Sequence, residues 1–297
     1  ILQARYGLKW NPFSQDIPSE ALQKRPEVDH FCWRVENLVM DGGFALITGD
    51  PGRGKSAALR MLADRLGDIR DVVVCEVSRP QSRVGDFYRE MGSMFNLDVR
   101  PSNRYGGHKG LREKWRAHIE STCFRPVILI DEAQQMDPYV LTELRLLSSA
   151  QFDTKILLTV VLCGDERLTN KLRAPDLLPI HSRLRTTLVM QPASREELIG
   201  LMTNALELAG NSQLMTEELI ATLAEHAAGN CRDLMIAAEN LLLEAVRREL
   251  KELDTKLYIE YFTPRNEAPR KERSSPGLTT PKMSSSTGSA LKRKSSS

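Results

Sequence analysis

Residues 49–56, GDPGRGKS, match the phosphate-loop pattern G-x-x-x-x-G-K-[ST] in full. The pattern follows a predicted strand and begins a predicted helix, which is the context that such a loop requires. Its glycines let the backbone wrap around phosphate oxygens, and N–H groups of the loop and of the helix N-terminus donate to them. Lys55 is expected to reach the β- and γ-phosphates, and the Ser56 hydroxyl to ligate Mg²⁺. The predicted phosphate-binding residues are Gly49, Asp50, Pro51, Gly52, Arg53, Gly54, Lys55, Ser56 and Ala57.

A second motif, VILIDEAQQM at residues 127–136, consists of a short apolar run that ends in two acidic residues. Because Asp131 closes a predicted buried strand, we expect its carboxylate beside the phosphate loop, where it holds Mg²⁺ directly or through water. Glu132 is the candidate general base that polarises the attacking water. The alternative is a pair of carboxylates that only cap a helix, which the phosphate loop upstream makes less attractive. The two motifs together predict a site for ATP and Mg²⁺. A guanine nucleotide is disfavoured, because the Lys and Asp of NKLRAPD (170–176) do not have the spacing of a guanine-binding motif.

Apolar runs and amphipathic stretches alternate along the chain as far as residue 191. The runs are β-branched and almost continuously apolar, as strands covered on both faces are. This alternation predicts an α/β fold of the P-loop NTPase class, with a five-stranded parallel sheet and helices on both faces. Strands are expected at 44–49, 72–78, 126–131, 156–164 and 186–191, and helices at 55–66, 83–96, 109–121, 138–149 and 166–173.

After Pro192 the pattern becomes purely helical. Ser194 and Glu197 have capping-box spacing at the start of one helix, which Gly210 and Asn211 end. Two more helices are expected at about 217–228 and 231–250, separated by Gly229 and Asn230. The predicted domains are a nucleotide-binding α/β domain (1–193), a small all-α lid domain (194–262) and a disordered tail (263–297).

The composition is that of an ordinary globular protein, with 41% hydrophobic and 27% charged residues. No apolar run approaches the roughly 18 residues of a membrane span, and no signal segment opens the sequence. The five scattered cysteines lack metal-ligand spacing, which indicates reduced thiols in a cytoplasmic protein. Residues 265–297 have a net charge of +6, so the rest of the chain is at −4. This Ser-, Thr- and Pro-rich tail is either a nucleic-acid-binding arm or a solubilising segment.

The same two motifs occur in helicases, which need a second RecA-like lobe. Residues 192–297 are expected to be helices and tail, without strands for another sheet. The helicase interpretation is therefore disfavoured, and ATP is expected to act as a switch.

Further motifs resemble those of AAA+ ATPases of the ExeA/TniB group. YGLKWNPF (6–13), the phosphate loop, LIDEAQQM, LTELRLLSS (141–149) and GNCRDLM (229–235) follow one another in the order seen in that group. The group includes ATP-dependent target-selection proteins of bacterial transposons and a type II secretion ATPase. The resemblance covers roughly residues 5–250 and rests most specifically on the N-terminal motif and on DEAQ followed by ELRLL.

The resemblance implies roles for several further residues. Asp165 in CGDERL looks like the sensor that orients the attacking water, although the group usually has Gln or another neutral polar residue there; Ser149 likewise stands where Asn is common. Arg183 looks like an arginine finger for a neighbouring subunit, with Arg185 as the reserve candidate. Arg232 looks like the second sensor, reaching the γ-phosphate from the lid; the alternative is a surface arginine paired with an acid such as Asp233 or Glu239. Asn11, Pro12 and Phe13 are expected to border the adenine.

An arginine finger supplied in trans implies a homo-oligomer, either a ring or a filament, in which hydrolysis depends on assembly. The segment 100–119 is the most basic stretch before the tail, with six Lys/Arg against one acid. We expect Arg104, Lys109 and Arg112 to contact duplex DNA without reading its sequence. The alternative is a solvated helix face.

Two functions follow from this resemblance. The first is a regulator of transposition, which assembles on DNA with ATP, recruits and stimulates a transposase, and disassembles on hydrolysis. The second is an ATPase of a secretion or cell-envelope assembly system. Because the secretion relatives continue into a membrane span and an envelope domain that this sequence lacks, the sequence favours transposition, with no membrane contact.

Overall fold

The computed structural model describes residues 5–14, 16–18, 21–22, 25–96, 106–150 and 155–262. Of residues 106–109, 111, 112, 149, 150, 155 and 156 it describes the backbone alone. Residues 1–261 form one compact unit. The predicted disordered tail, 263–297, lies outside the described residues.

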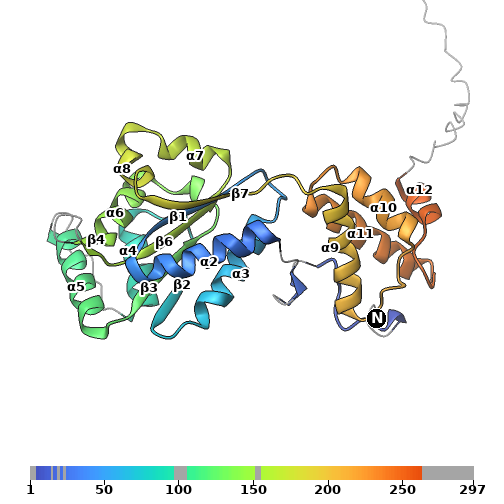
Figure 1. Cartoon of the computed structure of the whole chain (residues 1–297), viewed down its shortest axis with the longest axis horizontal. Coiled ribbons are helices and arrows are strands. Elements are labelled where there is room, and N and C mark those ends of the chain that lie inside the picture. Colours follow the sequence, from blue (N-terminus) through green and yellow to red (C-terminus); the bar gives the residue numbers. More distant parts are fainter. Residues whose placement is uncertain are drawn as a thin grey trace, which may run out of the picture. The chain divides into compact units, whose positions relative to one another are not determined.

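The central sheet has five parallel strands in the order β2-β3-β6-β1-β7 (Figure 1). Its strands are β1 (Gly43–Thr48), β2 (Val72–Glu76), β3 (Arg125–Ile130), β6 (Thr159–Gly164) and β7 (Leu184–Val189). Every residue of β1 and of β6 is buried, which explains their unbroken apolar character. The predicted five-stranded parallel sheet is confirmed.

One predicted strand is divided in two by the structure. Residues 156–164 were expected to form a single strand, but β6 begins only at Thr159. Upstream, β5 (Lys155–Ile156) pairs antiparallel with β4 (Ser149–Ala150) in a separate hairpin. Leu157 and Leu158 between them are buried, so the apolar run continues while the backbone leaves one ladder for another. Hydrophobicity alone does not locate such a break.

Helices cover both faces of the sheet because alternate strand residues point to opposite sides. In β1, Phe44 and Leu46 pack in the core with α4 (Val84–Met94), α5 (Gly106–Thr122) and α6 (Pro138–Ser148). Ala45 and Ile47 pack in the second core with α2 (Pro26–Asp41) and α3 (Lys55–Gly67). The two cores hold the sheet rigid beneath the loops that follow its strands.

The helix α2 is a feature that the sequence analysis missed. Pro26 occupies its first turn, and its buried residues Val28, Phe31, Val35 and Val39 recur at helical spacing. Gly42 ends it with a φ of +74°, a conformation that glycine adopts without steric cost. This helix completes the face of the sheet that α3 alone would leave partly open.

The helical part, residues 195–262, follows the last strand. It consists of α9 (Arg195–Ala209), α10 (Glu217–His226), α11 (Cys231–Arg247) and α12 (Thr255–Phe262). The predicted capping box between Ser194 and Glu197 is present at the start of α9. Tyr6, Leu8 and Phe13 from the N-terminal segment pack into the hydrophobic cluster of these helices. The helical part therefore shares its core with the start of the chain.

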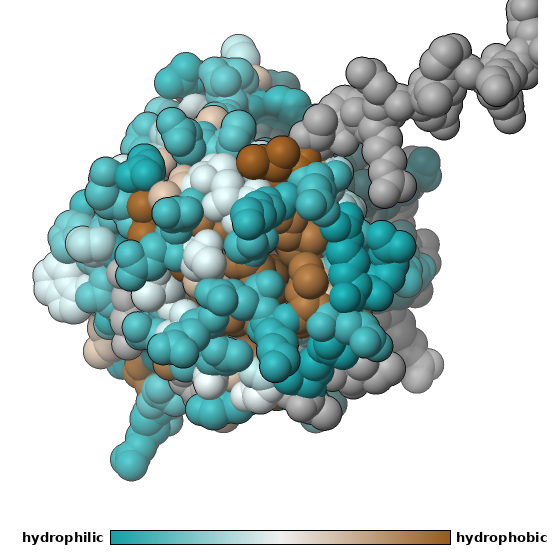
Figure 2. Space-filling view, turned by 90° about the vertical axis from the view of Figure 1, so that its right-hand side faces the viewer, coloured by the Kyte–Doolittle hydropathy of each residue, from teal (hydrophilic) through white to brown (hydrophobic). Residues whose placement is uncertain are grey.

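The surface of the helical part combines charged and apolar side chains. Figure 2 shows hydrophobic residues gathered in the middle of one face, with hydrophilic residues around them. The exposed apolar side chains of α11 and α12 include Ile236, Leu243 and Ile259. Among the residues that the structure describes, no helix is both long enough and apolar enough to span a membrane.

Glu244 connects α11 to the loop beyond it through two arginines. Its carboxylate accepts hydrogen bonds from Arg247 Nε at 2.7 Å and from Arg248 Nε at 2.6 Å. These bonds lower the pKa of Glu244 to about 2. Because the folded-state pKa lies below the ordinary value, the stabilisation is present at neutral pH and is lost as the pH falls from about 4.5 towards 2.

We therefore expect the free energy of unfolding to depend less on pH in Glu244→Gln than in the wild-type chain under acidic conditions. The urea midpoint should fall less between pH 6 and pH 3 in the variant than in the wild-type chain, because one paired carboxylate no longer protonates. Urea unfolding at both pH values measures this. Glu252→Gln, a change at an exposed acid of the same region, is the control. Equal acid sensitivity of wild type and Glu244→Gln would contradict the prediction.

Candidate functional site

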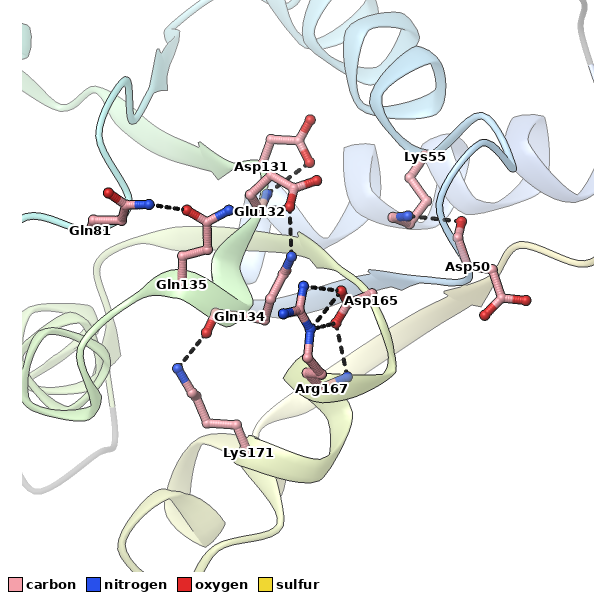
Figure 3. A network of polar contacts seen from close by, with 10 residues as sticks. All are labelled: Asp50, Lys55, Gln81, Asp131, Glu132, Gln134, Gln135, Asp165, Arg167 and Lys171. Atoms are coloured by element: carbon pink, nitrogen blue, oxygen red, sulfur yellow. Dashed lines mark hydrogen bonds and ion pairs between the residues drawn. The ribbon is translucent and has the colours of Figure 1, made fainter. Parts of the chain in front are cut away.

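The carboxyl ends of the parallel strands bring the predicted site residues to one edge of the sheet. The phosphate loop follows β1, Asp131 follows β3, and Asp165 follows β6 (Figure 3). Since the strand order is β3-β6-β1, Asp165 follows the strand next to the loop and Asp131 follows the strand beyond it, so both carboxylates lie on the same side of the loop that precedes α3. The structure therefore places together the residues that sequence spacing assigned to ATP and Mg²⁺.

Backbone conformation and close packing explain two of the loop glycines. Gly54 has a φ of +90° immediately before α3, in the left-handed region that disfavours other residues. At Gly49 a Cβ atom would lie 2.8 Å from the carbonyl oxygen of Met190, so a side chain there would push the loop off β7. The loop is thus held close to the sheet with its N–H groups at the start of α3.

Lys55 is a buried cation in this loop, with 7% of its surface exposed. Its Nζ donates to the carbonyl oxygen of Asp50 at 3.0 Å, and within the described part of the chain no carboxylate pairs with it. A buried ammonium needs an anion nearby to offset its lost hydration. The phosphates of ATP would provide that charge, so Lys55 fits the predicted nucleotide.

Asp131 is half-buried at the end of β3, and its Oδ1 accepts a hydrogen bond from the Glu132 N–H at 2.8 Å. Burial, together with the negative charge of Asp131, raises the pKa of the neighbouring Cys163 thiol, which therefore stays neutral. The described residues include no group of three or more His, Cys, Asp or Glu that could hold a metal ion. The Asp131 carboxylate and the Ser56 hydroxyl are oxygen donors that suit Mg²⁺, and they would hold it together with phosphate oxygens and water.

Glu132 sits in a strained backbone conformation, with a φ of +52°. Its Oε2 accepts a hydrogen bond from Gln134 Nε2 at 2.6 Å, and a longer one from Gln135 Nε2. Such strain persists only where surrounding contacts fix it, and it is concentrated at functional sites. The side chain is exposed at the sheet edge, so its carboxylate remains accessible to a water molecule.

Lys171 fixes the turn that carries Glu132. Its Nζ donates to the carbonyl oxygens of Gln134 and Met136, the latter at 2.8 Å. Gln81 donates from the opposite side to Gln135 (Figure 3). Burial lowers the pKa of Lys171, and these two carbonyls partly replace the water that its ammonium has lost. The turn η2 (Ala133–Gln135) is thus anchored to α7 (Glu166–Leu172).

Asp165 follows β6 and caps α7, accepting the Arg167 N–H at 2.9 Å. Its carboxylate also pairs with the Arg167 side chain. The predicted sensor position therefore holds an ion pair instead of a neutral polar side chain.

The start of α11 touches the phosphate loop through its backbone. The Arg232 N–H donates to the Gly52 carbonyl at 3.3 Å, and Arg53 Nη1 donates to the Gly229 carbonyl at 2.6 Å. At Gly52, whose φ is +81°, a Cβ atom would lie 2.0 Å from Asn230 Oδ1, so only glycine permits this approach. Arg232 is thereby placed next to the loop, with its side chain exposed.

Arg183 lies at the other edge of the sheet. Phe44 at the start of β1 pairs in register with Leu184, and Thr48, just before the loop, pairs with Val189. Arg183 precedes Leu184 and is therefore about 20 Å along the sheet from Gly49, the first residue of its own phosphate loop, at roughly 3.3 Å per residue. Its Nη1 donates to the Pro179 carbonyl at 2.6 Å. Arg185 lies two residues further along and is exposed.

The N-terminal motif is attached to the helical part. Asn11 Nδ2 donates to Glu239 Oε1 at 2.9 Å, and Phe13 is buried in the helical cluster. Glu239, one of the two acids considered as partners of Arg232, thus binds Asn11. Contact of Asn11, Pro12 and Phe13 with adenine stays a prediction.

The predicted DNA-binding residues lie mostly beyond the described side chains. Arg104 is outside the described residues, and Lys109 and Arg112 lie in α5 with only their backbone described. Trp115 of the same segment is buried and packs edge-on against Phe95, with ring centroids 4.7 Å apart. It is a core residue, so it does not contribute to a DNA-binding face.

A family model described as an AAA domain matches residues 39–172, which include the phosphate loop, the acidic motif at 127–136 and Asp165. Over these residues the chain resembles AAA domains. It is also 30% identical over 248 residues to General secretion pathway protein A from Aeromonas hydrophila, across 82% of this chain and 44% of that protein. The resemblance to AAA+ ATPases of the ExeA group is confirmed. The chain spans less than half the length of that relative.

Solved structures of AAA+ proteins have the same fold. Cdc6p from Pyrobaculum aerophilum matches with a TM-score of 0.65 and 14% identity, over 82% of this chain and 67% of that one. ORC2 from Aeropyrum pernix in its ADP form matches with a TM-score of 0.68 and 13% identity, over 84% and 70%. At this identity the likeness shows the fold, including helices after the sheet, and confirms the predicted fold class.

The sequence analysis did not assign several residues that the structure places at the site. Arg167 and Lys171 lie on α7, and Gln134 holds Glu132. Asn230 was treated only as a helix break, although a residue with N-cap preference before a predicted helix could have indicated its capping role. No sequence motif indicated Lys171, because its partners lie far upstream in the chain. None indicated Arg167, because its contact with Asp165 depends on the formation of α7.

Proposed function

We propose that this chain hydrolyses ATP with Mg²⁺ and that ATP controls its association with further copies of itself. The position of Arg183 is the observation on which this proposal rests. At the amino end of β7 it cannot reach the phosphates of its own subunit, while an AAA domain of a second copy could place its site against it. The exposed apolar residues Ile236, Leu243 and Ile259 supply further surface for such contact.

Within one subunit the roles follow from the geometry. Lys55 and the loop N–H groups bind the phosphates, and Asp131 and Ser56 hold Mg²⁺. Glu132 accepts a proton from the water that attacks the γ-phosphate. Arg232, at the start of α11, reaches the nucleotide from the helical part, which we propose to be a lid domain with its boundary near residue 193.

For the biological setting, we propose an ATPase of a secretion or cell-envelope assembly system. Its support is the named relative, General secretion pathway protein A, which matches 82% of this chain. This reverses the preference drawn from the sequence. That preference relied on the membrane span and envelope domain that follow the ATPase part in the secretion relatives. Because the chain spans only 44% of its relative, the lack of these segments is not evidence against a secretion role.

A second candidate is the regulation of transposition on duplex DNA. The basic segment 100–119 and the net charge of +6 in residues 265–297 favour it. Structural neighbours include Drosophila ORC bound to DNA, at 17% identity. Under this candidate Arg104, Lys109 and Arg112 contact DNA phosphates, and a transposase is the partner.

The test is the mass of the assembly with a non-hydrolysable ATP analogue, with and without duplex DNA, by light scattering and electron microscopy. We expect the analogue alone to produce oligomers of the wild-type chain and none of Lys55→Ala, whose phosphate site lacks its cation. Oligomers that need duplex DNA, and that weaken steeply with salt, would favour the second candidate. A chain that stays monomeric under all these conditions would contradict the proposal.

A further inference from the structure

The tip of β6 is followed by a carboxylate, Asp165, which caps α7. In this chain that carboxylate is fully engaged by one side chain. Arg167 Nε lies 2.9 Å from Asp165 Oδ2 and 3.1 Å from Oδ1, and Arg167 Nη2 lies 2.6 Å from Oδ2. The Asp165 side chain is 15% exposed and that of Arg167 is 75% exposed. The arginine is therefore the outward member of a bidentate pair.

An unpaired carboxylate at this position would oppose ATP binding, because it would face the negatively charged γ-phosphate. Hydrogen bonds from Arg167 hold the pKa of Asp165 below its usual range, and the charge of Lys55 acts in the same direction. Asp165 is thus ionised at neutral pH, close enough to the phosphate-binding lysine to respond to its charge. Something must balance that negative charge before a triphosphate can bind.

Arg167 is placed to do more than balance it. Its guanidinium lies on the Glu132 side of Asp165 (Figure 3). The hydrogen bonds and charge of Asp165 raise the pKa of Arg167, and the charge of Glu132 adds a smaller contribution in the same direction. Two of its three nitrogens bind Asp165, while Nη1 has no hydrogen-bond partner among the described residues. Arg167 is thus a cation with an unused hydrogen-bond donor on the side of Asp165 that faces Glu132.

We propose that Asp165 and Arg167 act as one unit, in which Asp165 orients the guanidinium and Arg167 donates to the γ-phosphate of ATP bound in the same subunit. This inference rests on the proposed ATPase function. It transfers the sensor role from Asp165, which becomes a positioning residue, to Arg167. Arg167 then adds to the two arginines already proposed at the nucleotide, Arg232 of the same subunit and Arg183 of a neighbour.

The competing explanation is that Arg167 only neutralises Asp165. A double-variant experiment separates the two, using Asp165→Asn, Arg167→Gln and the combination. Asparagine retains the N-cap of α7, and glutamine keeps the Arg167 backbone N–H, so the helix start should survive in all three. Arg173→Gln, a change at an exposed arginine at the end of α7, is the matched control.

The readouts are the affinities for ADP and for a non-hydrolysable ATP analogue, together with kcat and KM for ATP. Arg167→Gln should weaken analogue binding about 10-fold with ADP binding unchanged, as expected for loss of one charge-assisted bond. Its kcat should fall by about 10²-fold. Asp165→Asn should change analogue affinity by less than about 3-fold, because Arg167 remains charged.

The double variant decides between the two explanations. If it is as defective as Arg167→Gln, the guanidinium itself contacts the γ-phosphate, as proposed. Recovery of the double variant to near wild-type analogue affinity would overturn the proposal, since neutralisation alone would then suffice. An Arg167→Gln variant indistinguishable from Arg173→Gln would overturn it as well. Failure of the wild-type chain to bind ATP would refute the proposed function itself, an outcome distinct from both.

Discussion

Glu132→Gln is expected to bind ATP normally and to hydrolyse it about 10²- to 10⁴-fold more slowly than the wild-type chain. Glutamine keeps the size of the side chain, and Gln134 and Gln135 can still contact its carbonyl oxygen. It cannot accept a proton from the attacking water. Steady-state ATPase assays, with nucleotide affinity measured in parallel, test the prediction.

The same variant should remain assembled after ATP is added, whereas the wild-type chain should disperse as ATP is consumed. Glu166→Gln, on the exposed first turn of α7, is the control for loss of a nearby negative charge. Disassembly of Glu132→Gln at the wild-type rate would show that hydrolysis does not time the assembly. Unchanged hydrolysis would remove Glu132 from the role of general base.

The sheet edge could be predicted from sequence because local pattern and chain connectivity determine it together. The loop glycines, Lys55 and Asp131 each follow a short apolar run, and parallel strands place the residues after such runs at one edge. The helices of residues 195–247 were also predictable, since Ser194 and Gly210 are strong end signals. These features need no knowledge of distant contacts.

The remaining features depend on tertiary contacts that no local pattern contains. Lys171 binds the carbonyls of Gln134 and Met136, which lie more than thirty residues upstream. Arg53 reaches Gly229 across most of the chain. The break before Thr159 arises because residues 155–156 pair with β4, whereas residues from Thr159 onward pair with β1 and β3. For Asp165, the sequence indicated the position, but its charge state became interpretable only with Arg167 bound to it.

Arg183→Ala is expected to lower the ATPase rate of the assembled chain by about 10³-fold or more, because a trans arginine stabilises the charge of the transferring phosphoryl group. Nucleotide binding by the isolated subunit should be unaffected, since Arg183 lies at the opposite edge of the sheet from its own phosphate loop. Arg185→Ala is the matched control, two residues along the same strand. A larger loss in Arg185→Ala would identify Arg185 as the finger.

Mixing two inactive variants distinguishes action in trans from action in cis. Glu132→Gln subunits lack the general base but still bind ATP, assemble and present Arg183, whereas Arg183→Ala subunits have an intact site but no finger. In a randomly mixed assembly about a quarter of interfaces join an intact site to an intact finger, so activity should reappear on mixing. If Arg183 acted within its own subunit, every site in the mixture would lack one of the two groups and no activity would return. Recovery therefore requires that each active site be built from two copies of this chain.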